Sequence, residues 1–123
     1  MDAASALNSP TARLQTGVEI TAASLTIGVL SADDTALLRL EGDLDAGSAP
    51  TLIAVGRTLV DGGSEDIVLD CDRLRFCDSA GIHALASLHR QPEVRSVSLV
   101  RTSATLRRLL EITGLQALFD RAA

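Results

Sequence analysis

The middle of the chain carries its most informative stretch, IVLDCDRLRFCDSAGIHAL at residues 67–85. It opens with three consecutive apolar residues, Ile67–Leu69, a run that is typical of a central strand covered on both faces. From Ile82 onward the apolar residues fall on one stripe at helical spacing, and Pro92 ends that pattern. The stretch therefore predicts a strand that leads through a turn into a helix.

The residues before this stretch predict a hairpin and a first helix. Residues 18–30 are rich in β-branched side chains and predict one or two short strands, SADDT at 31–35 predicts a turn, and ALLRLE at 36–41 predicts the next strand. A helix is expected to begin after Ser48 as its N-cap, with Pro50 in the first turn, and to end at the Gly62-Gly63 pair.

The residues after it repeat the alternation. Residues 94–100 predict a strand, and Ser103 predicts the cap of a further helix that Gly114 closes, followed by a short apolar segment at 115–119. Strands that alternate with helices imply right-handed crossovers. We therefore expect one α/β domain at residues 18–123: a mixed, mostly parallel sheet of four to five strands with helices packed on it and an antiparallel N-terminal hairpin. Residues 1–17 are expected to form a flexible tail.

Length and composition limit the function. A chain of 123 residues fits one domain and buries a sizeable core without a disulfide or metal. No apolar run approaches the ~18 residues of a membrane span, and no basic-plus-apolar leader opens the chain. The net charge of −5 disfavours nucleic acid, and the absence of Lys removes a P-loop lysine and a Schiff base to pyridoxal phosphate. We expect a cytoplasmic protein without a cofactor, whose partner is another protein or a small molecule, with no nucleic acid and no membrane involved.

The residues that could ligate a metal do not form a site. Cys71 and Cys77 have neither redox nor zinc spacing and are expected to be buried thiols. His83 and His89 lie about 240° apart around a helix, so they cannot share one metal; each is expected to be a surface or packing residue, with a pH-sensing role left open. The aspartates at 70, 72 and 78 lack calcium-loop spacing, and the first two are expected to end the strand and cap the turn.

The turn before the second helix is the place where chemistry could occur. Ligand sites in open α/β sheets gather at the carboxyl ends of strands, and Ser79 would lie at or near the first turn of a helix, where free N–H groups stabilise an anion. The simpler interpretation is that Asp78 or Ser79 only caps the helix. Gly81 would let another backbone approach closely.

These residues resemble a known family. GDLDAGSAPTL at 42–52, followed by the 67–85 stretch, resembles the STAS domain of bacterial anti-sigma factor antagonists, and LRRLLEITGLQALF at 106–119 is similar to the third helix and Gly-Leu exit of that family. The resemblance spans residues 36–119 and extends more loosely from Val18. The Asp-Ser-x-Gly motif alone is common, whereas its combination with the acidic loop and the Gly-Leu exit is fairly specific.

The resemblance implies a switch and no enzymatic activity. In this family the unphosphorylated domain binds an anti-sigma factor, often a serine kinase, and frees the sigma factor; the kinase phosphorylates the serine of the motif, here Ser79, and a PP2C-type phosphatase reverses this. Ala80 stands where many relatives carry a second hydroxyl, which leaves Ser79 as the acceptor. A monomer or weak homodimer is expected. The implied partner surface comprises Asp43, Asp45, Ser48, Phe76, Asp78, Ala80, Gly81, Ile82 and His83.

Electrostatics would make such a switch work. A phosphoserine adds about −1.5 to −2 charges, which would join Asp78, and by expectation Asp43 and Asp45, on a chain that already carries −5.

Two other classes of function stay open. One is a STAS scaffold or accessory subunit of a transport or stress-signalling complex. The other is a small hydrolase using Ser79 or Cys77, for which no GxSxG elbow is present and the nearest histidine, His83, lies four residues beyond Ser79.

Overall fold

The computed structural model describes residues 17–119, which form one five-stranded sheet and four helices. The elements in chain order are β1 (Val18–Ala22), β2 (Leu25–Ala32), β3 (Thr35–Leu44), α2 (Ala49–Asp61), β4 (Asp66–Cys77), α3 (Ser79–His89), β5 (Ser96–Val100), α4 (Ala104–Thr113) and α5 (Gln116–Phe119). Residues 1–16 and 120–123 lie outside the described residues, so the flexible tail stays a prediction. Within 17–119, no helix has the length and apolar character that crossing a membrane would require.

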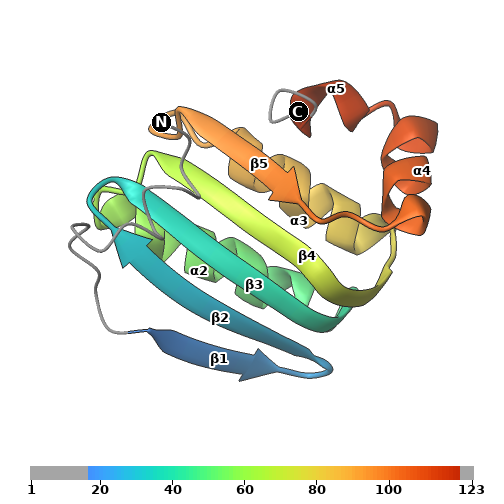
Figure 1. Cartoon of the computed structure of the whole chain (residues 1–123), viewed down its shortest axis with the longest axis horizontal. Helices are drawn as coiled ribbons and strands as arrows, with labels where there is room; N and C mark the ends of the chain where they lie inside the picture. Colours follow the sequence, from blue (N-terminus) through green and yellow to red (C-terminus); the bar gives the residue numbers. More distant parts are fainter. Residues whose placement is uncertain (1–16, 120–123) are drawn as a thin grey trace.

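The strands lie in the order β1-β2-β3-β4-β5 (Figure 1). β1, β2 and β3 pair antiparallel, whereas β3, β4 and β5 pair parallel. The mixed sheet and its N-terminal hairpin are therefore confirmed, although antiparallel pairing takes two of the four interfaces, a larger share than expected. The reason is that residues 18–32 form two strands, and the short turns that follow each of them, including the predicted one at Asp33-Asp34, can join only antiparallel neighbours.

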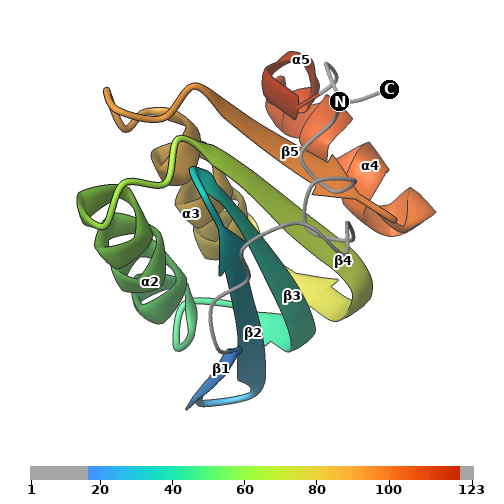
Figure 2. The same ribbon diagram turned by 60° about the vertical axis from the view of Figure 1, so that its left-hand side comes forward.

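Helices α2 and α3 cover one face of the sheet (Figure 2). Alternate residues of the three central strands point toward them and are almost fully buried: Leu25, Ile27, Leu38, Leu40, Ile67 and Leu69. The two helices pack closely because Gly56 of α2 leaves room for Leu88 of α3; a Cβ at position 56 would lie 2.0 Å from Leu88 Cδ2. Helices α4 and α5 lie beside β5 at the end of the sheet.

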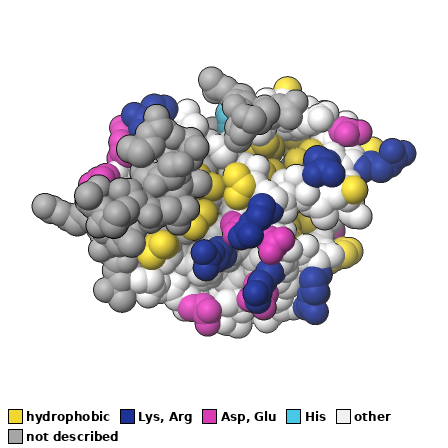
Figure 3. All heavy atoms as spheres, viewed as in Figure 1, with side chains coloured by type: hydrophobic (Ala, Val, Ile, Leu, Met, Phe, Trp, Pro, Cys, Tyr) yellow, Lys and Arg dark blue, Asp and Glu magenta, His cyan; other side chains and the backbone are white. Residues whose placement is uncertain are grey.

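The opposite face of the sheet carries charged side chains. Figure 3 shows basic and acidic groups interspersed over it, and they line a hollow of about 480 Å³ that includes Arg39, Glu41, Asp70 and Arg101. Asp70 is only 6% exposed, and its carboxylate accepts hydrogen bonds from the Arg101 guanidinium and from the Asp72 amide at 3.1 Å. The charges on this face are thus largely paired with one another.

Two boundaries differ from the prediction. β4 continues beyond Leu69 to Cys77, so Asp70 and Asp72 do not end the strand; its parallel pairing with β3 resumes after a register shift. β5 begins at Ser96 instead of Val94, because the Val94 amide donates to the Gln91 carbonyl at 3.0 Å and closes a turn. The first difference arises from a pairing partner that lies far away in the sequence, and the second from a local turn.

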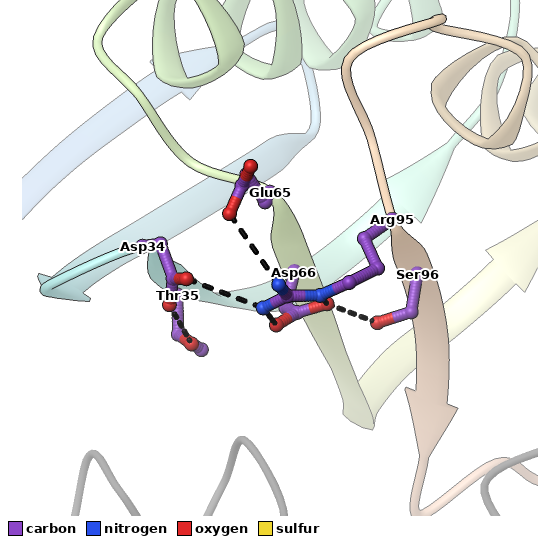
Figure 4. Close-up of polar contacts among 6 residues, drawn as sticks. All are labelled: Asp34, Thr35, Glu65, Asp66, Arg95 and Ser96. Carbon is purple, nitrogen blue, oxygen red and sulfur yellow. Dashed lines mark hydrogen bonds and ion pairs between the residues drawn. The ribbon is translucent and has the colours of Figure 1, made fainter.

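A network of ion pairs ties the amino ends of β4 and β5 together (Figure 4). The Arg95 guanidinium contacts the carboxylates of Asp66, Asp34 and Glu65, and the Ser96 hydroxyl donates to Asp66 at 2.7 Å. The hydrogen bond from Arg95, aided by Ser96, outweighs partial burial and lowers the pKa of Asp66. This network stabilises the end of β4 opposite to Ser79.

Candidate functional site

The site forms where the carboxyl ends of the parallel strands β3 and β4 meet. Asp43 pairs with Phe76 and Leu44 with Cys77 in the last register positions of the two strands. The Asp78 amide then donates to the Leu44 carbonyl at 3.2 Å, which joins the start of α3 to the end of β3. Two segments that are separated by 27 residues in the sequence, 43–48 and 76–83, are thereby brought together.

Asp78 is the N-cap of α3, and Ser79 is its first helical residue. The Asp78 carboxylate accepts a hydrogen bond from the Gly81 amide at 3.0 Å, as an N-cap side chain does. Of the two capping residues left open by the sequence, the structure therefore selects Asp78. Ser79 is exposed, and within residues 17–119 its hydroxyl has no hydrogen-bond partner, so it is free to react or to contact another molecule.

Gly81 is required for the contact between α3 and β3. A Cβ at this position would lie 2.6 Å from the Leu44 carbonyl oxygen and 2.7 Å from Cys77 Sγ, distances at which something must shift. The close backbone approach predicted from the glycine is confirmed. It holds the first turn of α3, and with it Ser79, against the end of β3.

The loop between β3 and α2 is rigidified by its own side chains. The Asp45 carboxylate accepts from the amides of Gly47 and Ser48 at 3.0 and 3.2 Å. The Ser48 hydroxyl donates to the Asp43 carbonyl at 2.9 Å and accepts from the Asp45 amide at 3.0 Å. Ser48 precedes α2 as predicted, but its hydroxyl makes no capping bond because the loop uses it instead.

The structure divides the predicted contact residues into three groups. Phe76, which is 52% exposed, and His83 are on the surface. Asp43, Asp45, Asp78 and Ala80 are half-buried. Three others are buried, which corrects their expected role: they support the loop and the helix start and offer little side-chain surface to a partner. These are Ser48, Gly81 and Ile82.

The sequence analysis missed one residue of this edge, Arg75. Its guanidinium lies 3.8 Å from the Asp43 carboxylate, and Arg73 lies 3.9 Å from Glu41 one step earlier in the ladder. The alternation of Arg73 and Arg75 on the strand beside Glu41 and Asp43 is the signal that could have identified it, once the parallel pairing of β3 and β4 was known. Asp43 is consequently not a free negative charge.

Burial disfavours the thiolate form of both cysteines. Burial, reinforced by nearby negative charge, raises the pKa of both Cys71 and Cys77 to about 12. A thiol with so high a pKa is a poor nucleophile at neutral pH, and no hydrogen bond joins His83 to Ser79 in the described part of the chain. The geometry thus supplies no activated nucleophile for the hydrolase interpretation.

The remaining polar candidates have structural roles. The His89 ring packs edge-on against Phe119 of α5, with 5.9 Å between ring centroids, in agreement with a packing role. Among residues 17–119, no group of three or more His, Cys, Asp or Glu side chains is arranged to hold a metal ion.

Comparison with known proteins identifies the family. The family model described as "Mlab, STAS domain" matches residues 27–120, about three-quarters of the chain. The mixed sheet, its N-terminal antiparallel strands and the helices are consistent with the STAS fold. The chain belongs to the STAS domain family.

Solved structures of similar fold include anti-sigma factor antagonists. The crystal structure of an anti-sigma factor antagonist from Mycobacterium paratuberculosis is 25% identical, with a TM-score of 0.69, over 78% of this chain and 83% of that one. The antagonist SpoIIAA in its unphosphorylated form is 22% identical, with a TM-score of 0.58, over 79% and 83%. The Bacillus cell fate determinant SpoIIAA in the phosphorylated form is 22% identical, with a TM-score of 0.59, over 85% and 88%. At 22% identity, the last two comparisons establish a shared fold.

Proposed function

We propose that this protein is an anti-sigma factor antagonist that binds an anti-sigma factor when Ser79 is unphosphorylated and releases it on phosphorylation, thereby regulating sigma-factor-dependent transcription. The observation that carries this proposal is the exposed Ser79 hydroxyl at the first position of α3, which has no hydrogen-bond partner among residues 17–119. The STAS family assignment and the likeness to antagonist structures, including one of a phosphorylated form, support it.

The docking surface is the edge around that hydroxyl. Phe76 is a large apolar side chain that is half exposed three residues before Ser79, and such a residue is suited to anchor a partner in a pocket. A polar rim around this anchor would consist of Asp45, His83 and the ion pair between Asp43 and Arg75. Ser48 and Gly81 would contribute by holding the rim in place.

Phosphorylation would prevent docking without refolding the domain. The amino end of α3 tolerates an added phosphate because the helix dipole and the free N–H groups of the first turn stabilise an anion there. A partner that fits a neutral hydroxyl would instead have to desolvate about −1.5 to −2 charges on a chain that already carries −5. A penalty of about 3–4 kcal/mol would weaken the complex by roughly two to three orders of magnitude.

The proposed partners are an anti-sigma factor with serine kinase activity, which would bring its own ATP and Mg²⁺, and a PP2C-type phosphatase, in the cytoplasm. The test uses an anti-sigma factor whose gene is adjacent to the gene of this protein. After incubation with Mg-ATP, intact-mass analysis is expected to show one phosphate on the wild type and none on Ser79→Ala. Ser79→Ala is expected to keep wild-type affinity in a calorimetric titration.

The charge variant supplies the decisive comparison. The Ser79→Asp variant is expected to bind the anti-sigma factor at least about tenfold more weakly than the wild type does. The phosphorylated wild type carries a larger added charge and is expected to bind more weakly still. Thr105→Asp adds the same charge at an exposed position on α4 and is expected to bind within about twofold of the wild type. Wild-type affinity for Ser79→Asp would show that the charge switch is wrong.

A second candidate is a STAS scaffold or accessory subunit of a transport or stress-signalling complex that does not depend on phosphorylation. It is favoured by the family model, whose description names Mlab and STAS and no sigma-factor role. A non-kinase partner that co-purifies equally with the wild type and with Ser79→Asp would support this candidate.

A further inference from the structure

In the described part of the chain, residues 17–119, the outer edge of β1 is open. β1 lies at one end of the sheet, and among residues 17–119 no strand pairs with its outer side (Figures 1 and 2). Edge strands present unpaired N–H and C=O groups to other chains, and proteins usually protect them with Lys, Pro, a bulge or a covering helix. β1 has the sequence VEITA, without Lys or Pro, and pairs with β2 in unbroken register. At the other end of the sheet, α4 and α5 lie beside β5.

An apolar groove runs beside this edge on the α2 side of the sheet. It has a volume of about 440 Å³ and is bounded by Val18 and Ile20 of β1, Val29 of β2 and the outer surface of α2, from Pro50 to Leu59. Val18, which borders this groove, is 54% exposed. A strand added to β1 would therefore have apolar side chains beside which to pack its own.

The edge is complementary to a second copy of itself. Ala22 and Leu25 flank a two-residue turn and form a hydrogen-bonded pair, so Val18, Ile20 and Ala22 direct their backbone groups toward β2. Glu19 and Thr21 then direct theirs outward. In an antiparallel pairing centred on Ile20, Glu19 of each copy faces Thr21 of the other in two hydrogen-bonded pairs.

The side chains match in the same register. Glu19 is the only charged residue of β1, and it meets an uncharged Thr21, so no like charges are opposed. On the α2 side, Ile20 meets Ile20 of the other copy and Val18 meets Ala22, where the two grooves join. A register shifted by two residues in one direction would bring Glu19 opposite Glu19, and a shift in the other direction would leave Val18 and Glu19 of each copy without a partner in β1.

We propose that β1 is the interface of a symmetric dimer of this chain, in which two five-stranded sheets become one continuous sheet. The symmetry axis passes beside Ile20 and is perpendicular to the sheet, so both α2 helices lie on the same side. Because each copy contributes only one short strand and its flanking groove, the dimer is weak, with a dissociation constant of about 10 μM to 1 mM.

The first test measures assembly and its dependence on charge. In sedimentation equilibrium of the full chain, the average mass is expected to rise from 12.8 kDa toward twice that value as concentration increases into the millimolar range. Thr21→Lys places a cation opposite Glu19 and Thr21→Glu places an anion there, each twice per dimer. The two variants are expected to differ by about tenfold or more in dissociation constant, with the Lys variant the tighter.

Matched variants separate this local effect from net charge. Thr105→Lys and Thr105→Glu make the same charge changes on α4 and are expected to differ by less than about twofold. An equal difference at both positions would overturn the proposed interface. A wild-type chain that stays monomeric at millimolar concentration would also overturn it and would leave the groove to an extended segment of a different protein.

The second test reads the register directly. Residues that face each other in a non-hydrogen-bonded antiparallel pair have Cα atoms about 4.5 Å apart, within the range of a disulfide. Ile20→Cys is therefore expected to give a disulfide-linked dimer under mild oxidation. Thr21→Cys, which faces Glu19 of the other copy, is expected to give at least about tenfold less of the linked dimer. Equal cross-linking of the two variants would overturn the register. Cys71 and Cys77 interfere little, since one is buried and the pKa of the other is raised to about 12.

Discussion

Replacing Gly81 with alanine is expected to weaken the attachment of α3 to the sheet. The added Cβ would lie 2.6 Å from the Leu44 carbonyl oxygen, 2.7 Å from Cys77 Sγ and 2.9 Å from Leu44 Cγ. Leu44 is fully buried and its carbonyl accepts from the Asp78 amide, so it cannot move aside freely. Inserting a methyl group into such a site costs about 1–3 kcal/mol, whereas replacing a helical glycine with alanine returns up to about 1 kcal/mol. We expect a net loss of about 1–2 kcal/mol in the free energy of unfolding.

Urea unfolding followed by circular dichroism measures this loss. Gly62→Ala is the matched control, because Gly62 is exposed, has φ −84° and would place its Cβ 3.4 Å from the nearest oxygen. That variant is expected to stay within about 0.5 kcal/mol of the wild type or to gain slightly. Wild-type stability of Gly81→Ala, or an equal loss in both variants, would refute the argument that Gly81 is required by close packing.

The other predictions concern single interactions. Asp78→Ala removes the 3.0 Å cap to the Gly81 amide and is expected to lower the unfolding free energy by about 1 kcal/mol, with Asp78→Asn losing less; urea unfolding of both variants checks this. Burial alone would raise the pKa of Asp70, but hydrogen bonds from Arg101 and from the Asp72 amide, with nearby positive charge, hold it below its usual value. Since the folded pKa is the lower one, ionised Asp70 stabilises the fold above the unfolded pKa of about 3.9, and this contribution is lost as pH falls through the folded pKa. Arg101→Ala is therefore expected to lower the urea midpoint at pH 7, with a smaller difference at pH 3; an equal difference at both pH values would contradict the pairing. Because the pKa of Cys77 is raised to about 12, iodoacetamide at pH 8 is expected to label the folded chain far more slowly than the urea-unfolded one, on the order of a hundredfold or more, as intact mass would show.

The sequence predicted the elements better than their ends. Apolar periodicity and capping residues located α2, α3 and α4 because a helix is specified by residues within one or two turns of each other. The end of β4 was not predicted, because its second half is held by pairing with β3 and not by its own apolar pattern. An acid such as Asp70 inside a strand signals a turn locally, and its contacts with Arg101 and the Asp72 amide make it tolerable there.

For the candidate site, the sequence predicted the position of Ser79 but not the surroundings of the neighbouring side chains. The exposure of Ser79 agrees with its predicted position at a helix start. The predicted contact set included Ser48 and Ile82, which are buried, and omitted Arg75. Burial of a serine depends on the loop that folds over it, and the pairing of Arg75 with Asp43 depends on the register of two strands; neither is a property of the local sequence.

The sequence alone determined the order of strands and helices and the start of α3 near Asp78 and Ser79. It also indicated a close backbone approach at Gly81. Each of these depends on residues that are neighbours along the chain. Folding in three dimensions alone determined that Leu44 lies against Gly81 and that one face of the sheet is covered and the other charged. It also determined that no strand within residues 17–119 pairs with the outer edge of β1. These features depend on which distant segments become adjacent, and that is settled by the joint packing of the whole core.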